Sequence, residues 1–80
     1  MLHLIAVGEQ VATHRKRLKL SQAELSRKAG ISRATLDALE NGRARELGFS
    51  KISRLFGALG LELTLQPARS HRPALDELML

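Results

Sequence analysis

Few side chains of this sequence have the type and spacing that chemistry at a site requires. The three histidines, His3, His14 and His71, lie in separate segments, and the chain has no cysteine, so we expect no metal site and no thiol nucleophile. Ser21 and Ser32 stand where helix caps are expected, which accounts for both without catalysis. With no nucleophile beside a base and no phosphate-binding glycine loop, the sequence predicts neither an enzyme nor a cofactor.

The remaining candidates for a functional role are the positively charged side chains, which can bind a negatively charged partner. The 80 residues carry 13 Lys and Arg against 8 Asp and Glu, a net charge of +5, and residues 1–60 hold 11 of the basic and 5 of the acidic ones. A basic body favours a polyanion such as nucleic acid, although a solvated surface that keeps the protein soluble would have the same composition. Because the 2 Phe are the only aromatic residues, stacking platforms for single strands are missing, which favours double-stranded DNA.

One small domain must position these charges. Apolar residues at helical spacing predict four helices, at about residues 4–18, 22–29, 33–41 and 49–59. The residues expected to face inward are Leu4, Val7, Val11, Leu18, Leu25, Ala29, Ile31, Leu36, Leu39, Ile52, Leu55, Phe56 and Leu59. No apolar run is long enough to span a membrane, and the apolar start lacks the basic leader of a signal peptide, so we expect a cytoplasmic protein.

Two short helices joined by a tight turn form the central motif. Ser21 and Glu24 have the spacing of a capping box at the start of the first helix. Gly30 follows its end, where a left-handed backbone is least strained in glycine, and Ser32 is placed to cap the second helix. Such a pair of helices is a helix-turn-helix, in which the start of the second helix enters the major groove of DNA.

Three blocks within residues 20–42, S-Q-x-x-L, A-G-I-S and L-E-N-G, occur in an order and spacing that resemble the lambda repressor/Cro (XRE) helix-turn-helix family. The likeness extends over about residues 4–60, and Ser26 stands where alanine is usual between the two helices. The resemblance implies a mostly α fold, a four-helix lambda-repressor-like DNA-binding domain over residues 1–60.

The resemblance also assigns roles to the matching positions. Family members contact bases through the exposed face of the recognition helix, which here implies Arg33, Ala34, Thr35, Asp37 and Ala38. They hold phosphates at the helix starts and in the loop after the recognition helix, which implies Gln22, Ser32, Asn41, Arg43 and Arg45. A structural ion pair between the first helix and the end of the recognition helix implies Arg15 and Glu40.

Several of the base-contact candidates have a second interpretation. Arg33 suits guanine through its two-pronged donor, or pairs with a phosphate. Asp37, one helical turn further on, accepts from cytosine or only orients Arg33. Ala34 and Ala38 touch thymine methyls or leave room for the groove, and Thr35 contacts a methyl, a phosphate or the helix start. With one arginine among small residues, we expect modest direct readout, with DNA shape supplying part of the specificity.

Residues 61–66 alternate leucine with polar residues, which is the period of a half-buried β-strand. A lone strand leaves its backbone groups unpaired, so the simplest partner is the same strand of a second copy. The homodimer contact would then involve Leu61, Leu63 and Leu65. Such a dimer presents two recognition helices to a palindromic operator. The alternative is an extended segment that folds onto its own chain.

The predicted order is thus a helix-turn-helix domain at residues 1–60, a dimerisation strand at 61–67 and a flexible tail at 68–80, with a short fifth helix in the tail as an alternative. This layout resembles that of HipB-type antitoxins, which repress their own operon and bind a HipA-type kinase toxin. The sequence therefore predicts a transcriptional repressor that is also an antitoxin. A stand-alone Cro-like regulator and a protein-interaction module that does not bind DNA are the alternatives.

Overall fold

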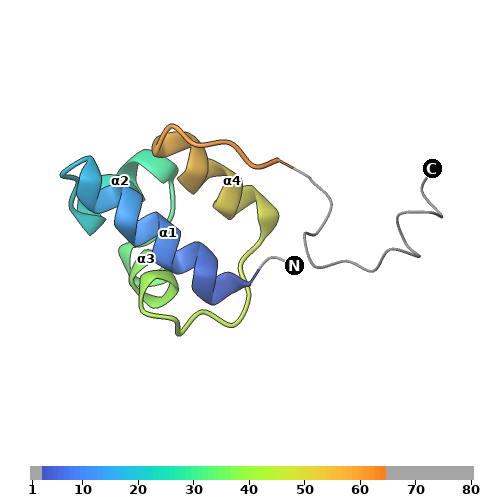
Figure 1. The fold of residues 1–80 in the computed structure, drawn as a ribbon. Coiled ribbons are helices and arrows are strands. Elements are labelled where there is room, and N and C mark those ends of the chain that lie inside the picture. The colour runs from blue at the N-terminus through green and yellow to red at the C-terminus, as the bar shows by residue number, and fades with distance from the viewer. Residues whose placement is uncertain (1–2, 65–80) are drawn as a thin grey trace, which may run out of the picture.

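Four α-helices make up the part of the chain that the computed structural model describes, residues 3–64. They are α1 (Leu4–Arg17), α2 (Gln22–Ala29), α3 (Arg33–Glu40) and α4 (Phe49–Ala58). α1 packs against α3, and α2 packs against both α3 and α4 (Figure 1). The mostly α fold and the four predicted helices are confirmed. No helix within residues 3–64 is long and apolar enough to cross a bilayer.

One apolar core lies between the helices. Its buried members are Val7, Val11, Leu25, Ala29, Leu36, Leu39, Ile52, Leu55 and Leu59. Leu18, which helical spacing placed on the buried stripe, is instead 52% exposed, because it caps the end of α1 and the chain turns away directly after it. Ile31 and Phe56 are only partly buried and pack against the edge of the core.

Serine caps start the two motif helices. The Ser21 hydroxyl accepts from the Glu24 amide at 3.0 Å, and the Glu24 carboxylate accepts from the Ser21 amide at 2.8 Å. This confirms the predicted capping box, and these bonds with Ser21 lower the pKa of Glu24. The Ser32 hydroxyl accepts from the Thr35 amide at 3.1 Å and donates to the Thr35 hydroxyl at 2.8 Å. Both helices therefore begin at a defined residue.

All four helices end in the same hydrogen-bonded turn. After each one, a residue in the left-handed conformation and the residue that follows it both donate their amides to carbonyls of the last helical turn. Glycine occupies the left-handed position after α2, α3 and α4, with φ of 71° at Gly30, 72° at Gly42 and 75° at Gly60. After α1 the position belongs to Lys19, with φ of 59°. A side chain makes this conformation less favourable than it is for glycine.

α1 approaches α3 most closely at Gly8, a position that no sequence pattern singled out. Gly8 is buried, and a Cβ there would overlap the carbonyl oxygen of Leu39 near the end of α3. Only a residue without a side chain permits this approach. The contact holds α1 against the end of α3 where Glu40 lies.

Residues 61–64 follow α4 and form no strand within the described part of the chain. Their side chains still alternate as predicted: Leu61 and Leu63 pack half-buried against the core of their own chain, while Glu62 and Thr64 are exposed. Residues 3–64 contain no strand with which this segment could pair. The expected homodimer pairing therefore stays a prediction.

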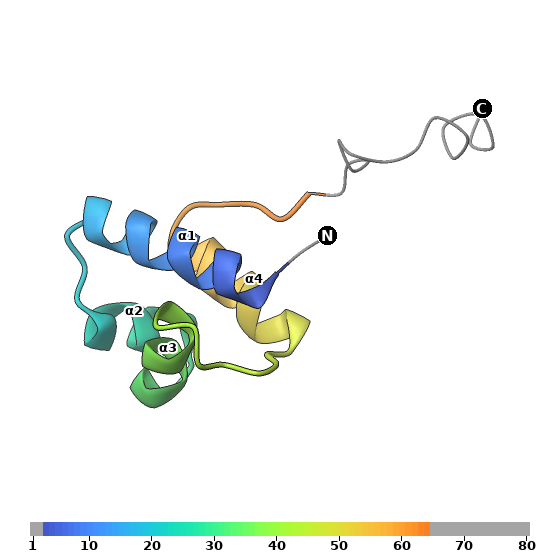
Figure 2. The same ribbon diagram turned by 60° about the horizontal axis from the view of Figure 1, so that its bottom comes forward.

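The segment at residues 61–64 runs along the side of the molecule opposite α3 in both views (Figures 1 and 2). The rest of the predicted dimerisation strand, including Leu65, and the tail at residues 68–80 lie outside the described residues.

Candidate nucleic-acid interface

α3 presents side chains that the resemblance assigned to base contacts, in its first turn and, at Ala38, in its second. Arg33 and Ala34 are exposed, whereas Thr35 and Ala38 are half-buried. The opposite side of α3 is buried in the core, which fixes the rotation of the helix about its axis. Arg33 belongs to neither of the two ion pairs found within residues 3–64. Its guanidinium group is therefore available to an outside acceptor.

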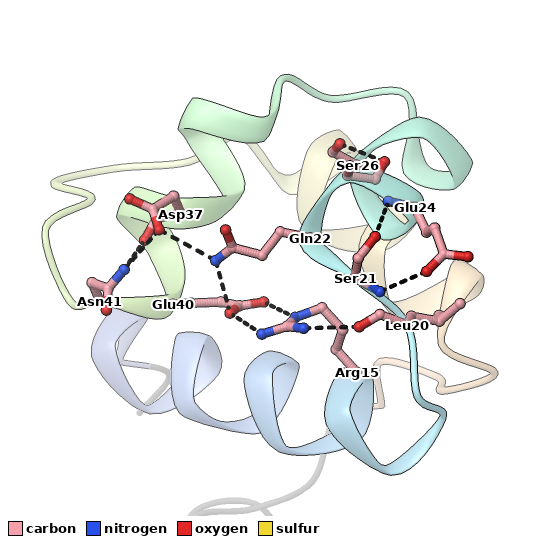
Figure 3. A network of polar contacts seen from close by, with 10 residues as sticks. Arg15, Leu20, Ser21, Gln22, Glu24, Ser26, Asp37, Glu40 and Asn41 are labelled. Carbon is pink, nitrogen blue, oxygen red and sulfur yellow. Dashed lines mark hydrogen bonds and ion pairs between the residues drawn. The ribbon is translucent and has the colours of Figure 1, made fainter.

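Arg15 of α1 and Glu40 of α3 form a largely buried ion pair. The Arg15 Nε donates to Glu40 Oε2 at 2.7 Å and its Nη2 donates to Oε1 at 2.9 Å, while Nη1 donates to the carbonyl of Leu20 at 2.8 Å (Figure 3). The two side chains are only 12% and 5% exposed. The hydrogen bond to Glu40 raises the pKa of Arg15 above its usual value. Since each guanidinium nitrogen and each carboxylate oxygen has a partner, the bonds offset the cost of removing both charges from water.

Gln22, the first residue of α2, connects this ion pair to the outer face of α3. Its Nε2 donates to Glu40 Oε1 at 3.1 Å and to Asp37 Oδ1 at 3.3 Å (Figure 3). The side chain that the resemblance assigned to a phosphate thus bridges α2 and α3. A phosphate contact through this amide nitrogen would replace one of the two bonds. Sequence patterns missed the bridge because its ends lie 15 and 18 positions apart, a spacing without a periodic signal.

Asp37 accepts hydrogen bonds through both carboxylate oxygens. Oδ1 accepts from Gln22 and from Asn41 Nδ2, the latter at 3.0 Å, and Oδ2 accepts from Arg43 Nη2 at 2.7 Å. The bond from Gln22, followed by the bond from Arg43, lowers the pKa of Asp37. The carboxylate is therefore paired with Arg43 in the loop after α3 rather than with Arg33 one turn earlier. The left-handed turn at Gly42 directs the loop back over the end of α3.

The loop after α3 carries the other residues expected to bind phosphate. Asn41 also donates to the backbone carbonyl of Asp37 at 2.9 Å. Arg43 is 61% exposed although it is paired. Arg45 is exposed and, like Arg33, belongs to neither ion pair within residues 3–64. The site therefore combines a cluster around Asp37 with two unpaired guanidinium groups, one at the start of α3 and one beyond its end.

The comparisons with known proteins agree with this geometry. A family model described as helix-turn-helix matches residues 11–66, which includes the whole of α2, α3 and α4 and the second half of α1. The searches of curated proteins and of solved structures found no match.

Proposed function

The chain belongs to the helix-turn-helix family of DNA-binding transcription regulators, of the lambda repressor and Cro type, and we propose that it is a sequence-specific repressor that binds a palindromic operator as a homodimer. In this proposal the first turn of α3 enters the major groove, where Arg33 donates to guanine and the small side chains beside it lie against neighbouring bases. The residues proposed to hold phosphates are Gln22, Ser32, Asn41, Arg43 and Arg45. The observation that carries the proposal is the unpaired Arg33 on a helix whose orientation is fixed by the core.

The homodimer part of the proposal depends on the segment after α4. Leu61 and Leu63 face the core of their own chain, so the backbone edges of the segment point sideways, where a second strand can pair with them. The segment lies on the side of the molecule away from α3 (Figure 2). Pairing there would join two chains without covering either recognition helix.

We further propose that the repressor is an antitoxin that regulates its own operon and binds a HipA-type kinase toxin. The support is the succession of the helix-turn-helix domain and the segment with alternating leucines, which is similar to the layout of HipB-type antitoxins. Co-expression with the product of a kinase-like reading frame next to its gene should yield a stable complex. Finding neither such a frame nor such a complex would favour a stand-alone regulator of the Cro type.

DNA binding should be strongly sensitive to salt. A dimer with about six to ten phosphate contacts should lose roughly 10³–10⁵ in affinity between 50 and 200 mM salt. The measurement is a fluorescence-anisotropy titration of a palindromic fragment from its own promoter, repeated at several salt concentrations. Binding that is absent or hardly changes with salt would contradict the repressor and favour the protein-interaction module.

The two unpaired arginines should differ in the same titration. Arg33→Ala should weaken the free energy of binding to the operator by about 1–3 kcal/mol and relax the base preference at one base pair per half-site. Arg45→Ala should weaken operator and random DNA about equally, because a phosphate carries no sequence information. If Arg33→Ala weakened both DNAs equally, its assignment to a base would be wrong.

A further inference from the structure

Asp37 places a negative charge on the face of the recognition helix that the proposed function turns toward DNA. Its side chain is 42% exposed, whereas the other acidic residue of α3, Glu40, is buried against Arg15. An exposed carboxylate repels phosphates and the acceptor atoms of guanine. A DNA-binding surface carries such a charge at a cost, unless the charge has a use there.

The partner of this carboxylate is one of the phosphate-binding candidates. Arg43 Nη2 lies 2.7 Å from Asp37 Oδ2, in a pair whose side chains are 61% and 42% exposed. Ion pairs in solvent are weak and can be exchanged for other partners. While the pair is formed, the charge of Arg43 is neutralised and contributes little to the attraction of DNA.

Asp37 itself is held independently of Arg43. Gln22 and Asn41 both donate to Oδ1, from α2 and from the cap of α3. Each of these two amide nitrogens has a second bond, to Glu40 Oε1 and to the carbonyl of Asp37, that a phosphate contact can replace, so Oδ1 keeps both bonds when Arg43 leaves. Departure of Arg43 would expose Oδ2, the acceptor atom beside the bases proposed to face α3.

We propose that Asp37 is a specificity-determining residue that releases Arg43 to a phosphate only when a base donor takes its place. This inference rests on the proposed function, in which α3 lies along base edges. On an operator, the amino group of a cytosine or an adenine is the donor that would replace Arg43 at Oδ2. Every base pair carries one such amino group, but random DNA does not place it opposite Oδ2 in most registers, so Arg43 then remains paired with Asp37 and makes no phosphate contact. The exchange couples base recognition to a backbone contact and lowers affinity for random DNA.

Two neighbouring arginines allow a matched test, in which each variant is titrated against an operator selected from random duplexes and against a random duplex. Arg43→Ala should weaken operator binding about fivefold or more per protomer, through the loss of one released counterion, and should hardly change binding to random DNA. Arg45→Ala, which removes an unpaired arginine, should weaken binding to the operator and to random DNA alike. Equal losses on both DNAs for the two variants would overturn the inference.

Removing the charge of Asp37 should have the opposite effect, a gain of affinity for random DNA. Asp37→Asn should raise affinity for random DNA about fivefold per protomer and steepen the salt dependence by about one counterion, while operator affinity does not rise. Adding Arg43→Ala to Asp37→Asn should then abolish the gain on random DNA. Glu9→Gln is the charge control, because Glu9 is exposed on α1 and in neither ion pair within residues 3–64; it should leave the ratio of operator to random affinity unchanged.

The possible failures are distinguishable. Wild-type protein that binds no DNA in a salt-dependent way would overturn the proposed function and this inference together. If the wild type binds DNA in a salt-dependent way but Asp37→Asn and Glu9→Gln have the same affinity for random DNA, this inference alone is overturned. Thermal unfolding followed by circular dichroism identifies any variant that has lost its fold. If Asp37→Asn is such a variant, Asp37→Glu replaces it in the test: it keeps the charge and should retain low affinity for random DNA.

Discussion

Gly8, Arg15 and Glu40 determine how α1 lies against α3. Gly8 allows the backbones to approach, and the ion pair closes the same contact with hydrogen bonds at 2.7 and 2.9 Å. Within residues 3–64 no buried side-chain nitrogen or oxygen lacks a hydrogen-bond partner. Since unpaired buried polar atoms are costly, this complete pairing allows a polar network to stand beside the apolar core. The orientation of the recognition helix depends on it.

Gly8→Ala should destabilise the domain by about 2–3 kcal/mol, because the new Cβ overlaps a backbone oxygen that cannot rotate away. Urea unfolding followed by circular dichroism measures the change. Gly57→Ala is the matched control, since Gly57 lies in α4 with open space around it. That substitution should stabilise the domain by roughly 0.5–1 kcal/mol. A loss of the same size at both positions would contradict the close contact at Gly8.

The four helices are short, and each depends on its ends. The longest, α1, has 14 residues and the two motif helices have 8 each, lengths at which isolated helices are marginal in water. Capping and packing together therefore hold them. The end of α1 differs from the other three, because Lys19 occupies the left-handed position that glycine occupies elsewhere.

Lys19→Gly should raise the free energy of unfolding by about 1 kcal/mol, because glycine adopts a left-handed backbone without steric cost. Gly30→Ala makes the reverse change at an equivalent turn with open space around it and should lower stability by a similar amount. Lys19→Gln separates the backbone effect from the loss of charge. Equal stabilities for Lys19→Gly and Lys19→Gln would show that the turn is not strained.

The molecule as a whole separates two surfaces. The recognition helix α3 and its loop lie on one side, and the segment at residues 61–64 lies on the other (Figures 1 and 2). A domain with so small a core gains stability from association. Because the two surfaces are apart, the proposed dimer at residues 61–64 would leave both copies of α3 uncovered for DNA, which would raise the effective concentration of the second half-site.

Proline substitutions at two successive residues test the proposed strand pairing. Amides of adjacent strand residues point to opposite edges, so either Leu63→Pro or Thr64→Pro should shift the protein toward monomer and weaken operator binding, and the other should not. Leu63→Ala, which keeps the amide, controls for the lost contact with the core. Sedimentation equilibrium reports the oligomeric state. Two proline variants that both remain dimeric would show that the interface lies elsewhere.

Acid should destabilise the domain through Glu24 and Asp37. Hydrogen bonds from Ser21 to the first, and mainly from Gln22 and Arg43 to the second, lower the pKa of both carboxyls in the folded state. A lowered pKa stabilises the fold above the unfolded pKa, and this stability is lost as the pH falls through the folded pKa. The free energy of unfolding should therefore decline as the pH falls below about 5. For Glu24→Gln, which can still cap α2, the free energy of unfolding measured in urea should decline less as the pH falls. A decline identical to that of the wild type would show that Glu24 does not contribute to the acid sensitivity.

Local sequence patterns predict the four helices, the serine caps of α2 and α3, and the family. These features follow from local rules: helical spacing of apolar residues, a capping box that spans Ser21 to Glu24, and glycine at left-handed turns. Arg33 and Arg45 were assigned by the resemblance to the family, and their roles stay a proposal. The segment at 61–64 showed its predicted alternation, because a period of two depends on neighbouring residues alone.

Contacts between residues far apart in the sequence depend on how the helices pack. Leu18 follows the helical spacing but lies outside the core, because the chain leaves α1 there. The overlap that requires glycine at position 8, the bridge from Gln22 to Asp37 and the pairing of Asp37 with Arg43 each depend on how separate segments are packed. Such contacts have no signature in the spacing of residues along the chain, since their geometry is set by the packing of three helices and the loop that follows them.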